Sequence, residues 1–410
     1  MISFRHATVL SGSGFDPVED ATVVVEGAVI QDVLASTRSA ARVSGDVIEC
    51  GGRTLMPGLI DAHVHVCALD VDLSAQRRTY PTSLMAYAIG KAIKEALDQG
   101  FTTVRDAGGA DWGMKEAVDR GLIPGPRMFV SGHPLSQSGG HGDSRTRAEN
   151  YAGCDCGAAI GMVSNIADGV DEVRRAVRTQ LRRGADQIKI MAGGGVASPT
   201  DRLESVQYRP DELGAAVAEA EAAGTYVLAH AYTPESIRAA VEAGVRSIEH
   251  GNFLDDATAS LMAARGTFLV PTFVTYEKLH EYGRERGLTA AQLGKLDLVL
   301  GSGLDGLRRA QQAGVRIASG SDLLGDLARY KTRELAIKAS VLGAHAALVA
   351  TTRTNAELIG IADEVGTIEP GKRADLLVVD GDPLADIGLL QDQGNLLAIM
   401  KAGQLYKHQL

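Results

Sequence analysis

The sequence predicts an α/β protein: a (β/α)8 TIM barrel with a small composite β-sandwich formed by both termini. From about residue 58 to residue 360, short apolar runs alternate with amphipathic helical stretches, about eight repeats in the order that a barrel requires. The two chain ends instead carry short apolar runs separated by glycine, proline and aspartate, which is typical of β-hairpins. The predicted domains are therefore residues 1–57 together with 361–410, and residues 58–360.

The sandwich is predicted from both ends of the chain. At the N-terminal end, the runs ATVL and ATVVVEGAVIQDVLA lie on either side of the turn-like GSGFDPVED. At the C-terminal end, GTIEPGKRADLLVVDGDPLADIG and LLAIMKAGQLYKHQL have the same character. A small sheet completed by both ends, beside one continuous inner domain, explains both patterns.

The barrel strands are predicted from eight apolar runs: LIDAHVHV, FTTVRDAG, RMFVSG, QIKIMA, YVLAHA, SIEHG, TFLVPTF and RIASGSD. Helical stretches such as DEVRRAVRTQLRRG and PESIRAAVEAG lie between most of them, and several end in the glycine that commonly stops a helix. A doubly wound sheet is the alternative, but no GxGxxG turn follows the first run. The long polar segment 133–170 follows the third run, and we expect it to cover the barrel mouth.

Composition excludes several classes of protein. The chain has 41 basic and 51 acidic residues, a net charge of −10, which argues against a nucleic-acid partner. No signal-like opening and no 18-residue apolar run occur, so we expect a cytoplasmic protein without membrane contact. Its four cysteines are too scattered for a disulfide framework, and Cys154 and Cys156 in GCDCG are interpreted as free loop thiols.

Two histidines stand at the end of the first barrel run, in LMPGLIDAHVHV at residues 55–66. Side chains two apart on a strand share a face, so His63 and His65 are expected to project together. Such a pair is either the beginning of a metal site or two hydrogen-bonded histidines in a turn. The rest of the chain decides between these interpretations.

Other polar residues occur where predicted strands end, and reactive groups gather at the carboxyl ends of barrel strands. Any one of them alone could be a structural residue, as a core histidine often is. Six such residues on five strands instead predict a metal site. The set is His63, His65, Lys189, His230, His250 and Asp322.

Lys189 carries the most information. In QIKIM, the alternation places Ile188 and Ile190 on one face and Lys189 on the other, toward the barrel interior. A buried ammonium is costly, and metal cations beside it would make the cost larger. An ion pair with Asp322 is one solution. The other is reaction of the neutral amine with carbon dioxide, because a carbamate is an anion that can bridge two metal ions.

These residues together resemble the pattern of the amidohydrolase superfamily. The resemblance covers nearly the whole chain, including LMPGLIDAHVHV and the tail GTIEPGKRADLLVVDGDPLADI. It implies a barrel with a composite β-sandwich and two divalent metal ions. We expect Zn²⁺ at both positions, although nitrogen and oxygen ligands also suit manganese, cobalt or iron. By the family pattern, His63 and His65 bind one ion with Asp322, His230 and His250 bind the other, and carboxylated Lys189 bridges them.

Within the superfamily, the chain resembles bacterial prolidase-like and carboxypeptidase-like dipeptidases. The motifs are TTVRDAGGADW, SQSGGHGD, QIKIMAGGGVASP, LAHAYT and SIEHGN, and the same set resembles amidohydrolases that split ochratoxin-like N-acyl phenylalanines. The resemblance implies hydrolysis of the amide bond to a C-terminal amino acid in a small-molecule or dipeptide substrate, and we expect the enzyme to be a homo-oligomer. Asp322 would take a proton from water and deliver it to the leaving amine.

Three further residues are candidates for substrate contacts. The resemblance implies that His141 contacts the scissile carbonyl oxygen as an oxyanion-stabilising donor and that Tyr232 binds the substrate α-carboxylate. The alternatives are a solvated loop histidine and a packed core tyrosine. Arg105 is a second carboxylate candidate because of its forked guanidinium, and a structural pair with Asp106 is its alternative. The triple glycine 193–195 lacks the lysine of a phosphate loop and is interpreted as a flexible loop.

Three other functions remain as alternatives. Hydrolysis of a cyclic amide, as in imidazolonepropionase-like relatives, uses a similar site. Deaminases of this superfamily typically use one metal without a carboxylated lysine, so Lys189 argues against deamination. A non-catalytic scaffold would usually have lost ligands, and all six are present. Pocket shape does not follow from the sequence, so proline, bulky apolar and aromatic C-terminal residues all remain possible substrates.

Overall fold

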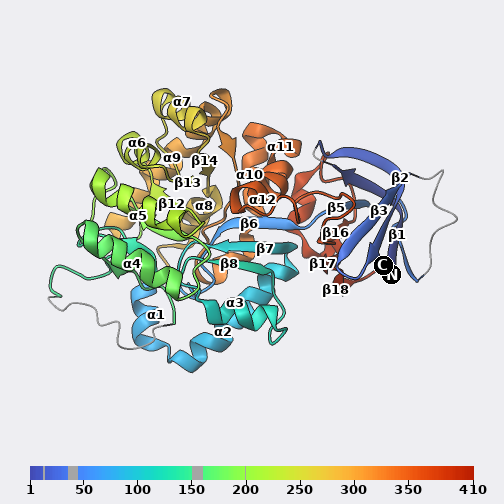
Figure 1. Cartoon of the computed structure of the whole chain (residues 1–410), viewed down its shortest axis with the longest axis horizontal. Coiled ribbons are helices and arrows are strands. Elements are labelled where there is room, and N and C mark those ends of the chain that lie inside the picture. The colour runs from blue at the N-terminus through green and yellow to red at the C-terminus, as the bar shows by residue number, and fades with distance from the viewer. Residues whose placement is uncertain (13, 36–44, 150–159, 199) are drawn as a thin grey trace.

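The computed structural model describes residues 1–12, 14–35, 45–149, 160–198 and 200–410. It has an α/β body with a β-sheet at one end, and both chain termini lie in that sheet (Figure 1). None of the helices in the described ranges has the length and apolar character that a membrane crossing requires.

The terminal sheet has eight hydrogen-bonded strands, with the three from the C-terminal end of the chain on one side and the five from the N-terminal end on the other. Along the sheet the order is β18 (Gln404–His408), β17 (Leu396–Lys401), β16 (Leu376–Val379), β5 (Thr54–Pro57), β1 (Ile2–Ser11), β2 (Asp16–Glu26) and β3 (Val29–Leu34), with β4 (Asp46–Glu49) beside β1. The two ends meet where β5 pairs with β1 on one side and with β16 on the other. The predicted β-structure shared by the two termini is confirmed, while the domain boundaries remain a prediction.

This sheet has a hydrophobic core of its own, because its strands are apolar on alternate residues. Phe4, Val23, Ile30, Leu55 and Met400 are fully buried within it.

All eight predicted barrel runs form strands, and neighbouring strands are parallel. One hydrogen-bonded sheet holds β6 (Leu59–Val64), β7 (Phe101–Asp106) and β8 (Arg127–Val130). The other holds β10 (Asn165–Ile166), β9 (Leu135–Ser136), β11 (Ile188–Met191), β12 (Val227–Ala231), β13 (Ser247–His250), β14 (Phe268–Val270) and β15 (Arg316–Ile317). The short strands β9 and β10 lie in the 133–170 segment and were not predicted.

A few backbone hydrogen bonds outside the strand ladders connect the two parallel sheets, at both edges of the sheet that holds β6, β7 and β8. Beside β6, Ala62 N donates to Ser319 O at 2.9 Å and Asp322 N donates to His63 O at 2.9 Å. Beside β8, Asp186 N donates to Val130 O at 2.8 Å. Residues just after β15 thus lie beside β6, and a residue just before β11 lies beside β8, although the strand ladders are not continuous there.

Helices follow most of the parallel strands and pack on their outer side (Figure 1). They are α1 (Leu73–Thr79), α2 (Thr82–Asp98), α3 (Trp112–Asp119), α4 (Val170–Arg182), α5 (Pro210–Ala222), α6 (Pro234–Ala243), α7 (Asp256–Arg265), α8 (Phe273–Tyr282), α9 (Ala290–Gln312), α10 (Arg333–Leu342), α11 (Ala344–Val349) and α12 (Asn355–Ile359).

The helix ends have the signals expected from the sequence. Helix α6 begins at Thr233, whose hydroxyl accepts a hydrogen bond from Ser236 N, and it ends at Gly244 in the left-handed conformation. Helix α7 begins at the capping residue Asp255 and ends at Gly266 in the same way. These short, well-defined connections fix where the next strand begins, and therefore where its carboxyl end presents side chains.

The structure describes two of the four cysteines. Cys50 and Cys67 are buried free thiols. Cys154 and Cys156, interpreted above as loop thiols, lie outside the described residues.

Candidate active site

All six predicted ligand residues line one cavity of about 410 Å³ at the carboxyl ends of the parallel strands. The parallel register sets this arrangement, because it places Met191 opposite His230 and Ala231 opposite His250 on neighbouring strands. The residues that the structure brings together are His63, His65, Lys189, His230, His250 and Asp322.

Asp322 lies at the centre of the imidazoles. Its Oδ1 is 3.5 Å from His63 Nε2 and 3.3 Å from His65 Nε2, and its Oδ2 is 3.9 Å from His250 Nδ1. The potential ligand atoms of His63, His250 and Asp322 all lie within 4.8 Å of one another, close enough to hold a metal ion. His230 is adjacent, with its ring centroid 4.5 Å from that of His250.

Backbone carbonyls orient two of these imidazoles. His65 Nδ1 lies 2.8 Å from Gly108 O, and His230 Nε2 lies 3.1 Å from Gly194 O. A carbonyl oxygen only accepts, so the nitrogen facing it carries the proton and the other ring nitrogen carries the lone pair. The lone pair is therefore on Nε2 of His65 and on Nδ1 of His230, as a metal ligand requires.

Burial keeps most of these imidazoles neutral. It lowers the pKa of His63 and His230 well below the ordinary value and lowers the pKa of His250 to about 3. Asp322 remains ionised: burial opposes this, but electrostatic interaction with the His63 ring and a hydrogen bond with His65 hold the pKa of the carboxyl well below its usual value. Neutral imidazoles around a carboxylate form the donor set that divalent metal ions bind.

Lys189 projects from β11 into the same cavity and is 1% exposed. Its Nζ has neither a hydrogen bond nor an ion pair with any described residue, so the alternative of a direct ion pair with Asp322 is not supported. Burial lowers the pKa of this amine to about 8. At pH 7 about a tenth of Lys189 is therefore a neutral amine, the form that reacts with carbon dioxide.

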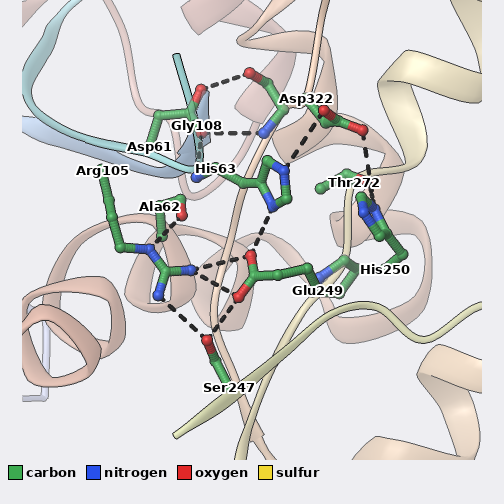
Figure 2. Close-up of polar contacts among 12 residues, drawn as sticks. Asp61, Ala62, His63, Arg105, Gly108, Ser247, Glu249, His250, Thr272 and Asp322 are labelled. Atoms are coloured by element: carbon green, nitrogen blue, oxygen red, sulfur yellow. Dashed lines mark hydrogen bonds and ion pairs between the residues drawn. The ribbon is translucent and has the colours of Figure 1, made fainter. Parts of the chain in front are cut away.

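Sequence reasoning missed Glu249, which contacts one ring nitrogen of His63 while Asp322 lies at the other (Figure 2). Its Oε2 accepts from His63 Nδ1 at 2.6 Å, while its Oε1 accepts from Ser247 Oγ at 2.6 Å. Both side chains of the His63–Glu249 pair are buried. The signal was present in SIEHG, because an acidic residue inside a buried strand requires a buried cation or donor.

That buried cation is Arg105, and its predicted role requires correction. Arg105 is 0% exposed, does not line the cavity, and donates through Nη2 to Glu249 at 2.9 and 3.0 Å (Figure 2). It also donates to Ala62 O at 2.6 Å. Its alternative partner, Asp106, instead accepts hydrogen bonds from Val66 N, Gly108 N and Ala110 N. Arg105 is thus a structural partner of Glu249, and this placement contradicts a contact with the substrate carboxylate.

The other two candidates do line the cavity. The ring of His141 stacks on that of His230, with centroids 4.2 Å apart, and it lines the cavity, which argues against a solvated loop histidine. The hydroxyl of Tyr232 lies 3.0 Å from that of Tyr276, and its ring centroid is 5.2 Å from that of His250. Both side chains are placed beside the ligand residues, and their roles toward substrate remain predictions.

Neutral imidazoles, one carboxylate and a buried amine without a partner among the described residues lie together at the ends of parallel strands, and they define a candidate metal-dependent hydrolase. The sequence model of the amidohydrolase family matches residues 54–406. The chain therefore belongs to the amidohydrolase family, whose members generally use divalent metal ions, and it is a hydrolase that acts on amide bonds.

Similar proteins agree with this membership. Ochratoxinase of Aspergillus niger is 32% identical over 434 aligned positions, which cover 99% of this chain and 87% of the ochratoxinase. A solved structure of a prolidase complexed with N-methylphosphonate-L-proline is 44% identical, covers 100% of both chains and has a TM-score of 0.96. A Xaa-Pro dipeptidase structure with bound methionine in the active site is 29% identical over 99% of both chains, with a TM-score of 0.88.

Proposed function

We propose that this enzyme is a two-metal hydrolase that releases a C-terminal amino acid from Xaa-Pro or Xaa-hydrophobic dipeptides and from N-acyl amino acids of the ochratoxin type. The observation that carries the proposal is Lys189, a buried amine without a partner among the described residues, beside imidazoles from neighbouring strands. Similarity to a prolidase and to an ochratoxinase supports the substrate class. A closed eight-stranded barrel is part of the proposal.

The donor set fits two divalent cations, which we take to be Zn²⁺. In the proposed arrangement His63, His65 and Asp322 hold one ion, and His230 and His250 hold the other. Nζ of Lys189 would attack carbon dioxide, forming a nitrogen–carbon bond and releasing one proton, and the resulting carbamate would supply a further anionic oxygen ligand. The bound ions would supply a Lewis acid for the scissile carbonyl and a water of lowered pKa.

The chain's own residues complete the chemistry. Asp322 accepts the proton of the attacking water and delivers it to the leaving amine. His141 faces the carbonyl oxygen, and the hydroxyl of Tyr232 holds the α-carboxylate. Glu249 orients His63.

The lining of the cavity supports an apolar C-terminal residue. Many of its side chains are apolar and would remove a proline ring or an aromatic ring from water. They include Val71, Leu73, Met162, Met191, Tyr276, Leu279 and Leu288.

The proposal is tested by incubating Zn²⁺-loaded enzyme with Xaa-Pro, Xaa-Phe, Xaa-Leu and Xaa-Arg dipeptides and with an N-aroyl-phenylalanine. Release of free proline, leucine or phenylalanine is expected, and release of none of them would overturn the substrate class. Turnover of a cyclic amide such as an imidazolone instead would favour the imidazolonepropionase-like alternative. Elemental analysis is expected to find about two metal ions per chain.

A further inference from the structure

The loop after β11 forms a second network of polar side chains beside the cavity, and the proposed function does not use it. Its centre is Asp201, whose side chain is 2% exposed. Asp201 Oδ1 accepts a hydrogen bond from Ser198 Oγ, and Oδ2 accepts from Gln207 Nε2 at 2.9 Å. Lys295 of α9, 3.3 Å from Oδ1, supplies the compensating positive charge.

Two side chains of this network, Ser198 and Gln207, contact His141. Ser198 Oγ lies 3.0 Å from His141 Nδ1, and Gln207 Oε1 accepts from His141 N at 2.8 Å. Asp201 therefore holds the ring of His141 through one neighbour and its backbone through the other, although it does not contact His141 itself.

The hydrogen bonds also decide which ring nitrogen carries the proton. Besides His141, Ser198 Oγ lies within reach of Asp201 Oδ1 and of Gly195 O, and both of these oxygens only accept. Ser198 has one proton and donates it to one of them. Its remaining contact is satisfied only when His141 Nδ1–H donates to Oγ. The neutral ring then has its lone pair on Nε2, which has no hydrogen-bond partner among the described residues.

Gly195 provides the space for this ring. A Cβ built on Gly195 would lie 2.0 Å from Cε1 and 2.1 Å from Nδ1 of His141. The middle of the triple glycine is constrained differently, since a Cβ on Gly194 would meet the backbone oxygen of Arg202 at 1.8 Å. The motif is thus explained by close packing against His141 and the loop backbone, which corrects its interpretation as a flexible loop.

We propose that Asp201 is a positioning residue which, through Ser198 and Gln207, holds His141 in the Nδ1–H form with Nε2 available to the substrate. The proposal deepens the proposed function and rests on it for the role of His141. In this form His141 presents the lone pair of Nε2 to the cavity.

A double-mutant cycle tests the coupling. Ser198→Ala is expected to lower kcat/KM on the best substrate about tenfold, mainly through kcat, as is typical when the partner of an active-site histidine is removed. In a His141→Ala background, the same substitution is expected to change kcat/KM by less than about twofold, because Ser198 acts through His141. Equal losses in both backgrounds would overturn the proposal.

Gly195→Ala provides a second test that leaves every polar group in place. It is expected to lower kcat/KM in the wild-type background and to have no further effect with His141→Ala, because the collision is then absent. Gly214→Ala in α5, where a Cβ meets nothing within 4 Å, is the matched control and is expected to leave kcat/KM unchanged.

A measurement independent of turnover separates this proposal from the proposed function. The ¹⁵N signals of the His141 ring in the Zn²⁺-loaded enzyme, assigned by their absence from His141→Gln, report which nitrogen is protonated. A protonated Nδ1 is expected, with this preference lost in Ser198→Ala. A ring protonated only at Nε2 would overturn the positioning role even if every dipeptide were hydrolysed, and a protonated Nδ1 would support it even if none were.

Discussion

At the residue scale, two residues at the centre of the site have an unusual backbone conformation, and the direction of their side chains depends on it. His250 and Asp322 have φ values of 77° and 52°, in the left-handed region that side chains other than glycine rarely adopt. Buried Asp61 holds the second of them, because its Oδ1 accepts from both His63 N and Ser321 N. The surrounding hydrogen bonds therefore maintain a strained turn that aims the Asp322 carboxylate at the imidazoles.

The role proposed for Asp322 leads to a direct prediction. Asp322→Asn keeps an oxygen ligand and the size of the side chain but removes the proton acceptor. We expect metal content to stay largely intact while kcat falls by about 10²–10⁴. Elemental analysis measures the metal content and steady-state kinetics measure kcat on the same preparation. Near wild-type turnover would contradict the role of Asp322 as the proton acceptor.

The Arg105–Glu249–His63 chain gives a second prediction. Glu249→Gln removes the charge that orients His63 and leaves the buried guanidinium of Arg105 without its counterion. We expect metal affinity to fall about 10–100-fold and the free energy of unfolding to fall by about 3–5 kcal/mol. Competition with a chelator measures the affinity, and urea denaturation measures the stability. Glu172→Gln, at an exposed ion pair of α4, is the control, with little expected change in either.

At the scale of elements, the terminal sheet and the barrel share a hydrophobic core. Leu377 of β16 and Leu396 of β17 are fully buried in the same cluster as Leu97 and Phe101 from the α2–β7 connection. Gly100 in that connection has a φ of 87°, and a Cβ there would lie 3.1 Å from Leu377 Cδ1. The two parts are thus packed together through apolar side chains.

Truncation of one of these side chains measures the shared core. Leu377→Ala is expected to lower the free energy of unfolding by about 2–5 kcal/mol, because it removes buried methyl groups and leaves a cavity. Leu298→Ala, at a side chain of α9 that is 58% exposed, is expected to change it by less than about 0.5 kcal/mol. Equal effects of the two substitutions in chemical denaturation would show that the sheet does not contribute to the barrel's stability.

Helix α10 gives a prediction about pH. Burial raises the pKa of Glu334 to about 7, although Lys338 Nζ lies 2.9 Å from its Oε1 and opposes the rise. The protonated form is therefore favoured by folding. Its contribution to stability is complete below the unfolded pKa of about 4.5 and is lost as pH rises through about 7.

We expect the wild type to lose about 1–3 kcal/mol relative to Glu334→Gln between pH 5 and pH 8, because the amide does not ionise. Urea denaturation of both proteins at the two pH values measures this difference. A difference between the two proteins that stays constant over this range would contradict the prediction.

At the scale of the whole molecule, the sequence predicted the parts of the site that follow from periodicity. The eight apolar runs, the shared sheet of the two termini and the convergence of six polar residues all depend on strand alternation and parallel order. Glu249 was missed and Arg105 was given the wrong role, because a contact between β7 and β13 depends on how side chains cross the interior. Gly195 was misread for the same reason, since its neighbour His141 comes from a distant segment.

Metal removal is expected to lower the stability of the whole protein. A ligand that binds only the folded state raises the free energy of unfolding by RT ln(1 + [L]/Kd), about 2.7 kcal/mol at one hundred times Kd. Treatment with a chelator should therefore lower Tm, and added Zn²⁺ should restore it. His63→Ala should show a much smaller response to Zn²⁺. An equal response of this variant would place the stabilising ion elsewhere.

The pairing of β5 with β16 also bears on how the enzyme is made. During synthesis, β5 and the first pair of histidines emerge from the ribosome more than 300 residues before β16, and contacts so distant in sequence close slowly. Until then, one edge of β5 has no partner, just before the strand that carries His63. The nascent chain must therefore keep this edge from pairing with another molecule until β16 has emerged.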